Sequence, residues 1–147
     1  MTVIDLPPLA IPIWFMRKMR LHAAGTSGEE VCGLLAGTPA GMVSRCYPVE
    51  NILHRADRFL MEPKAQFKVL MDLERRNLRL LAIYHSHPDG PAHPSETDLQ
   101  EFYYPEAYSI IWSRSGAQWI CRVFAMQAAS FREVAFRKIA TRQSITE

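Results

Sequence analysis

The sequence predicts an α/β fold in which a mixed β-sheet is flanked by helices. Helical patterns at residues 13–24 and 63–77 alternate along the chain with short apolar runs such as 80–84, which read as buried strands. Two further runs, within residues 108–125, read as a hairpin. A chain of 147 residues is long enough for one core and too short for two. Residues 1–147 are therefore expected to form a single domain.

An arm, a helix and two strands are expected in the amino-terminal third of the chain. Residues 1–12 contain several prolines and are expected to form an extended arm. Residues 13–24 read as a first helix, which the glycines and small residues at 25–28 interrupt. Residues 31–36 and 42–49 read as two strands joined by a turn.

The remaining segments continue the alternation. Pro63 stands at the start of a longer helix that carries apolar residues at Phe67, Leu70 and Met71 and ends near Asn77. A strand at 80–84, a short helix from Ser95 to about Tyr103, and hairpin strands at 108–112 and 118–125 follow. The last segment is ambiguous, because Phe131, Val134, Ala135 and Lys138 could form one face of a helix.

Composition excludes several function classes. The net charge is +2, which gives no strong attraction to nucleic acid or to a membrane surface. The start of the chain lacks the pattern of a signal peptide, and no apolar stretch approaches the length of a membrane span. Three widely spaced cysteines suit reduced thiols, so a cytoplasmic protein is expected. A single disulfide, for instance Cys32–Cys46, stays open.

The most informative pattern is His85-Ser-His87-Pro followed by Ser95-x-x-Asp98. Residues i and i+2 of an extended chain point to the same face, so both imidazoles can meet one ion. The turn residues after Pro88 allow the chain to return and deliver Asp98 as a third ligand. Two imidazoles and one carboxylate with a vacant fourth position are typical of catalytic zinc.

Plainer interpretations exist for each fragment of this pattern. The two histidines could be a hydrogen-bonded pair at a sheet edge, and Ser95 with Asp98 could simply cap a helix. Both fragments at this spacing favour the metal site, and Ser95 can cap the helix while it presents its hydroxyl to the site. His93, His22 and His54 are expected to be surface residues.

These residues, together with an upstream Glu30-x-Cys32-Gly33, resemble the signature of the JAMM (MPN-plus) zinc metalloproteases of the Jab1/MPN superfamily. The resemblance extends over about residues 29–112. It implies the MPN fold, itself similar to cytidine deaminase, and a strand for the ambiguous last segment. Glu29 is the alternative to Glu30 as the glutamate of this signature. The family places its glutamate two residues before Cys-Gly, which selects Glu30.

The resemblance also implies a mechanism and a cofactor, one zinc ion per chain. His85, His87 and Asp98 would bind the zinc ion, and Glu30 would move a proton from a zinc-activated water to the leaving amine. Ser95 would help zinc to stabilise the oxyanion. The reaction would be hydrolysis of a peptide or isopeptide bond without a covalent intermediate.

The substrate class follows from the resemblance to minimal, stand-alone prokaryotic members. Members of this type are similar to peptidases that act at the C-terminus of ubiquitin-like β-grasp proteins, including sulfur carriers. The connection from Asn51 to Met61 is short, and so is the segment after Asp98, which argues against polyubiquitin specificity. The aromatic residues Phe102, Tyr103 and Tyr104 are expected to line a groove for the substrate tail.

Two other functions and one assembly state stay open. The chain could be a small-amide zinc hydrolase, or a non-catalytic MPN scaffold that binds partners. A zinc deaminase is excluded, because the sequence lacks Pro-Cys-x-x-Cys. A homodimer is a further expectation that the family suggests.

Overall fold

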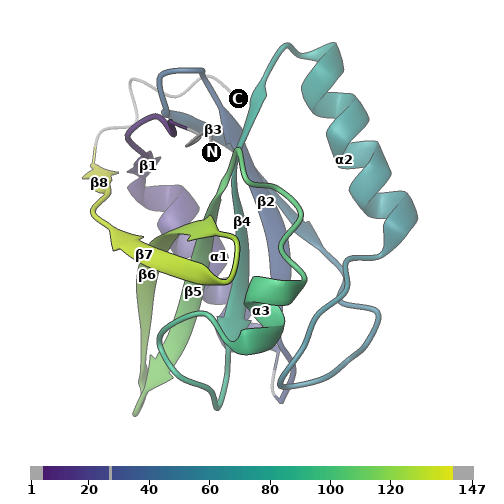
Figure 1. Ribbon diagram of the computed structural model, residues 1–147, viewed down its shortest axis with the longest axis vertical. Coiled ribbons are helices and arrows are strands. Elements are labelled where there is room, and N and C mark those ends of the chain that lie inside the picture. Colours follow the sequence, from purple (N-terminus) through teal and green to yellow (C-terminus); the bar gives the residue numbers. More distant parts are fainter. Residues whose placement is uncertain (1–4, 27, 141–147) are drawn as a thin grey trace.

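The computed structural model describes residues 5–26 and 28–140, and its core is a six-stranded mixed sheet. The strand order is β3-β2-β4-β5-β6-β7, in which only β4 and β5 run parallel (Figure 1). In chain order the elements are β1 (Ala10–Pro12), α1 (Ile13–Gly25), β2 (Cys32–Gly37), β3 (Val43–Val49), α2 (Pro63–Arg75), β4 (Arg79–His87), α3 (Glu96–Gln100), β5 (Tyr108–Ser115), β6 (Gln118–Gln127), β7 (Ser130–Val134) and β8 (Arg137–Ile139).

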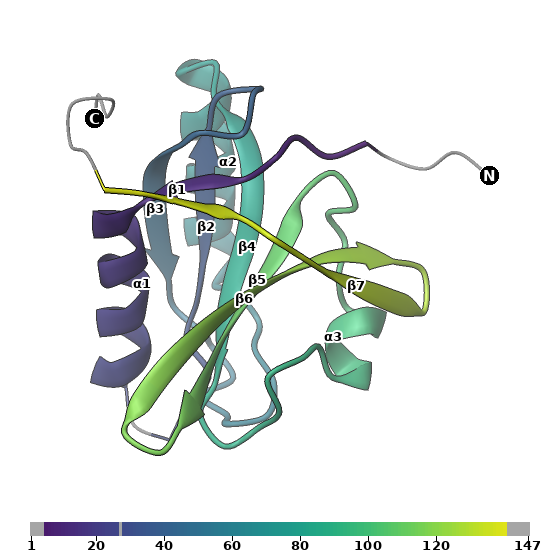
Figure 2. The same ribbon diagram turned by 90° about the vertical axis from the view of Figure 1, so that its left-hand side faces the viewer.

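Helices cover both faces of the sheet, as the sequence predicts. Helix α1 packs on one face, and α2 and α3 lie on the other (Figure 2). The two long helices bury apolar residues at helical spacing: Phe15, Met19 and Ala23 in α1, and Val69 and Leu73 in α2. The prediction of an α/β fold with a helix-flanked mixed sheet is confirmed.

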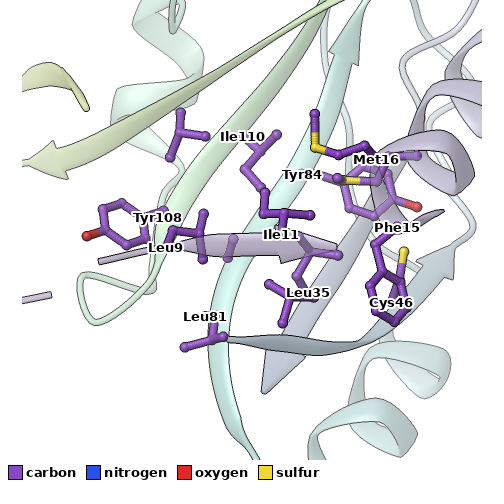
Figure 3. Close-up of a cluster of buried hydrophobic side chains, with 14 of the residues drawn as sticks. Leu9, Ile11, Phe15, Met16, Leu35, Cys46, Leu81, Tyr84, Tyr108 and Ile110 are labelled. Atoms are coloured by element: carbon purple, nitrogen blue, oxygen red, sulfur yellow. The ribbon is translucent and has the colours of Figure 1, made fainter. Parts of the chain in front are cut away.

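The carboxyl-terminal part of the expected extended arm is a paired strand. Ala10–Pro12 forms β1, which pairs in parallel with β8, and Leu9 and Ile11 are almost completely buried. Leu9 and Ile11 point into the hydrophobic cluster between α1 and the sheet (Figure 3). This segment belongs to the core because it pairs with a strand more than a hundred residues away. Residues 1–4 of the expected arm lie outside the described residues.

Other boundaries shift by a few residues for local reasons. Helix α2 ends at Arg75, because Asn77 adopts a left-handed backbone with φ of 55°. Strand β4 continues through His87, since β2 and β5 supply hydrogen-bonding partners on both sides. Helix α3 is shorter than expected, and the last segment consists of strands, as the family resemblance implies.

The cysteine pair left open by the sequence lies on opposite faces of the sheet. Cys32 is opposite Val49 and belongs to the core under α2, whereas Cys46 is opposite Leu35 and belongs to the core under α1. All three cysteines are free thiols. The Cys32–Cys46 disulfide is therefore excluded by the register of β2 and β3.

Gly33 of β2 is required by close packing against Tyr84. A Cβ atom at this position would lie 2.2 Å from the Tyr84 ring and 2.6 Å from the Tyr47 carbonyl oxygen. We expect Gly33→Ala to lower the free energy of unfolding by about 3 kcal/mol, the upper part of the range for over-packed cores. Urea unfolding measures this loss. Gly25→Ala is the matched control, because a Cβ there contacts nothing within 4 Å, and an equal loss in both variants would contradict the argument.

Candidate metal centre

Strand β4 holds both histidines on the sheet face that α2 and α3 cover. His85 and His87 alternate with Ser86, so their rings point to one side and the serine to the other. Pairing with β2 on one side and β5 on the other places this end of β4 inside the sheet. Both imidazoles are consequently buried, with 2% and 3% exposure.

Asp98 reaches the histidines from the first turn of α3. Ser95 is the N-cap of this helix, and its hydroxyl accepts a hydrogen bond from the Asp98 N–H at 3.1 Å. In return, the Ser95 N–H donates to Asp98 Oδ2 at 2.9 Å, which completes a capping box. The helix cap therefore also fixes the orientation of the carboxylate.

Glu30 points into the same site from the residue pair that precedes β2. Its side chain is 3% exposed, and Oε2 lies 4.0 Å from His87 Nε2. The neighbouring Glu29 points outward and shares a hydrogen bond with the exposed His54. Of the two adjacent glutamates, only Glu30 lies beside the β4 histidines, His85 and His87.

Four ligand atoms converge within 4.8 Å of one another, one each from Glu30, His85, His87 and Asp98. The two Nε2 atoms are 3.0 Å apart, and Asp98 Oδ2 lies 3.2 Å from His85 Nε2 and 3.0 Å from His87 Nε2. His87 Nδ1 donates to the Pro91 carbonyl oxygen at 2.6 Å, which leaves the Nε2 lone pair free in the neutral ring. This is the tautomer that binds a metal through Nε2.

Burial and neighbouring charges shift the pKa values of these groups strongly. Burial, with the negative charges of Asp98 and Asp57, raises the pKa of Glu30 to about 9. Burial opposes ionisation of Asp98, but His85, His87 and the Ser95 N–H outweigh it and hold the pKa of Asp98 well below its usual range. Burial also lowers the pKa of His85, which favours the neutral ring.

The donor set fits a divalent metal ion. Glu30 Oε1 is buried without a hydrogen-bond partner among the described residues, and a cation close to it would offset this cost. Two imidazoles and one carboxylate match the three protein ligands of catalytic zinc sites, which leave the fourth position to water or substrate. Glu30 would then be the fourth group of the cluster, beside a bound metal ion.

Asn51 is a buried residue of the site that sequence reasoning passed over. Its side-chain amide donates to the carbonyl oxygens of Glu30 and Arg58, and its oxygen accepts from the N–H groups of Leu53 and Leu60. All four hydrogen-bonding positions of the amide are thus used. Asn51 holds the backbone of Glu30 and the 51–61 loop in one arrangement.

Two more residues support the histidines. The Phe59 ring stacks on His85 with centroids 4.8 Å apart, and so covers one face of the imidazole. Ser86 Oγ accepts from the Val31 N–H at 2.8 Å, which ties β4 to the chain next to Glu30. Strand alternation predicts that Ser86 lies on the opposite face from the histidines. It does not predict the hydrogen-bonding partner, which comes from 55 residues away.

A cavity of about 330 Å³ opens beside the centre, and we call it the site cavity. His85 and Asp98 form part of its wall, together with Phe102, Tyr103 and Tyr104. Tyr104 accepts a hydrogen bond from Gln66 of α2 at 2.7 Å, whereas Tyr103 is 76% exposed at the rim. The three aromatic residues predicted to contact substrate are therefore gathered at one cavity.

The other histidines differ in their surroundings. His93 is exposed and stacks on Phe131, with centroids 5.8 Å apart. His54 is exposed as predicted. The prediction of a surface position is wrong for His22, which is half-buried and hydrogen-bonds the Tyr84 hydroxyl at 2.8 Å. The buried tyrosine, far away in sequence, requires this partner.

The fold and the site define a class: an α/β protein that can hold one metal ion on two imidazoles and a carboxylate, with a second carboxylate beside it, as mononuclear metallohydrolases do. The chain belongs to the family of prokaryotic homologs of the JAB domain, whose model matches residues 15–134.

Curated relatives are named as a protease, a desampylase and a peptidase. The chain is 39% identical over 104 residues to a probable TtuB-protein conjugate cleaving protease of Thermus thermophilus, covering 69% of this chain and 68% of the relative. It is 33% identical to a desampylase of Pyrococcus furiosus, with 71% of each chain covered. It is 31% identical to a CysO-cysteine peptidase of Mycobacterium tuberculosis, covering 71% of this chain and 73% of the relative.

Solved structures agree with the fold. A protein from Desulfitobacterium hafniense superposes with a TM-score of 0.80 at 26% identity, covering 90% of this chain and 94% of its own. A JAB1/MPN domain protein from Archaeoglobus fulgidus superposes with a TM-score of 0.56 at 19% identity, covering 89% and 99%. The predicted MPN fold is confirmed, and the family with its relatives makes the chain an enzyme of the JAMM peptidase type.

A membrane-spanning helix is not found in the described part of the chain. No helix within residues 5–26 and 28–140 combines the length and the apolar character that crossing a membrane requires.

Proposed function

We propose that this enzyme is a zinc-dependent peptidase that hydrolyses a peptide or isopeptide bond at the C-terminus of a ubiquitin-like β-grasp or sulfur-carrier protein. The observation that carries the proposal is the buried convergence of Glu30, His85, His87 and Asp98. The names of the relatives support the substrate class, since they describe cleavage of TtuB-protein conjugates and peptidase action on CysO-cysteine.

The residues divide into ligands and proton carriers. His85 Nε2, His87 Nε2 and Asp98 Oδ2 would hold the zinc ion. A bound zinc ion would supply Lewis acidity to a water molecule and to the scissile carbonyl group. The Glu30 carboxylate accepts a proton from that water and passes it to the nitrogen of the leaving amine.

Ser95, Phe59 and the site cavity surround these groups and have three further roles in the proposed reaction. Ser95 Oγ accepts from the Asp98 N–H, so its own hydrogen remains able to donate to the developing oxyanion. Phe59 covers the His85 ring and keeps bulk water away from that side of the ligand set. The aromatic wall of the site cavity binds the extended tail of the carrier protein.

The proposal is tested with a β-grasp carrier that bears a peptide extension after its Gly-Gly terminus and with the same carrier joined to a lysine side chain. We expect release of the intact carrier, loss of cleavage with a chelator, and recovery with zinc. Cleavage of small amides but of neither carrier substrate would favour the small-amide hydrolase. Metal binding without hydrolysis of any acyl substrate would favour the scaffold.

The exposed Tyr103 provides a test of the site cavity. We expect Tyr103→Ala to raise KM for the carrier substrate about 5- to 10-fold with little change in kcat, because the ring contributes binding and no proton transfer. Steady-state kinetics measure both constants. Phe67→Ala on α2 is the matched control, since Phe67 is 63% exposed and lies outside the wall of this cavity. An unchanged KM in Tyr103→Ala would remove Tyr103 from the substrate surface.

A further inference from the structure

Half of strand β6 is an unpaired edge of the sheet. Strand β5 pairs with Gln118–Phe124, but on the other side β7 pairs only with Val123–Gln127. Within the described part of the chain, no strand pairs with residues 118–122 on that side. The lower half of β6 is accordingly the outer margin of the sheet (Figure 1). Its outward N–H and C=O groups can pair with an added strand.

An apolar groove runs beside this edge, between α1 and β6, and we call it the α1 groove. It encloses about 550 Å³, and its walls include Met16 of α1, Trp112, Trp119 and Phe136. Ile120 of β6 also lines the groove and keeps 39% of its surface exposed. A strand paired with the free edge would direct alternate side chains into the α1 groove, where they would bury this apolar surface.

The rim of the α1 groove is cationic. Arg17 and Arg20 of α1 and Lys138 of β8 line it, and none of the described residues that line it is acidic. All three cations are exposed, and none takes part in an ion pair with another described residue. Two copies of this chain paired through their β6 edges would bring like charges together, which disfavours self-association here.

We propose that the free edge of β6 and the α1 groove bind an extended acidic segment of a partner protein by strand addition. The segment supplies backbone hydrogen bonds to residues 118–122, an apolar side chain for the groove, and carboxylates for Arg17, Arg20 and Lys138. The surface lies on the α1 face of the sheet, whereas His85 and the site cavity lie on the α2 face. A partner held there leaves the site cavity free, and its binding does not depend on the proposed peptidase activity.

The test uses a fluorescent peptide with the sequence Thr-Glu-Thr-Leu-Thr-Glu-Thr, whose alternation puts one leucine between two glutamates on the same face of a strand. Fluorescence anisotropy gives the dissociation constant for the whole protein. We expect binding that weakens about tenfold or more in Arg17→Glu/Arg20→Glu, because both carboxylates lose their partners. Slower amide hydrogen exchange at Trp119 and Cys121, whose N–H groups point away from β5, should accompany binding.

Controls separate strand addition from simple charge attraction. Lys64→Glu/Lys68→Glu makes the same change of net charge on α2, and should leave the affinity unchanged. A peptide with N-methyl groups on alternate residues keeps its charges but cannot extend the sheet, and should not bind. The proposal is overturned if wild type fails to bind the peptide, if the α2 variant weakens binding equally, or if the N-methylated peptide binds as well. Concentration-dependent dimers that protect the same amides would instead assign the edge to a second copy.

Discussion

Replacement of Glu30 by glutamine is expected to lower kcat by about 100- to 10,000-fold, the usual contribution of a general base. Glutamine has the same shape and fits the buried position, but its amide cannot accept a proton from water. The metal should stay bound, because the closest cluster of ligand atoms comes from His85, His87 and Asp98. Single-turnover kinetics and metal analysis of the same preparation measure the two properties.

Glu29→Gln is the matched control for this experiment. The same chemical change is made one residue earlier, on a side chain that points outward to His54. Turnover by Glu29→Gln should equal that of wild type. Near wild-type turnover by Glu30→Gln would assign the proton transfer to another group, and loss of the metal would make Glu30 a ligand.

Asp98→Asn is expected to remove both zinc and cleavage. The asparagine oxygen can still accept from the Ser95 N–H, so the cap of α3 survives, but the charge that holds the cation is lost. Zinc affinity should fall by more than about 100-fold, since residues that merely support a ligand already contribute roughly 10- to 100-fold. Competition with a chromophoric chelator measures the affinity.

The control for Asp98→Asn is Asp89→Asn, which changes an exposed carboxylate that lies 3.6 Å from Arg114. This variant should bind zinc and cleave substrate like wild type. Circular dichroism should show that both variants are folded. A folded Asp98→Asn protein that still binds one zinc ion tightly would contradict the assignment of Asp98 as a ligand.

The convergence of the four side chains of the candidate metal centre can be predicted from the sequence because most of them are local. His85, His87, Ser95 and Asp98 lie within fourteen positions, and strand alternation, a proline and a capping pattern are enough to bring them together. Glu30 needed the family resemblance, because it meets the histidines only through the antiparallel register in which Cys32 faces His85. Spacing alone does not specify that register.

Features that depend on distant contacts were missed. The β1–β8 pairing joins Ala10 to Arg137, so residues 10–12 have no local signal that marks them as a buried strand. His22 is polar and lies on a helix, and only the buried Tyr84 hydroxyl explains its position. Asn51 follows a strand, where asparagine is common for turn formation alone. In each case the missing information is a tertiary partner.

The hydrogen bonds of Asn51 also determine where this enzyme can be remodelled. They hold the 51–61 loop at Leu53, Arg58 and Leu60, and the Glu30 N–H binds the Arg55 carbonyl oxygen at 2.7 Å. Between these attachments, the tip at residues 56–57 can lengthen at a small entropic cost. Insertions at this tip would build a larger recognition surface while Glu30 stays in place, so bond cleavage and partner choice can diverge independently.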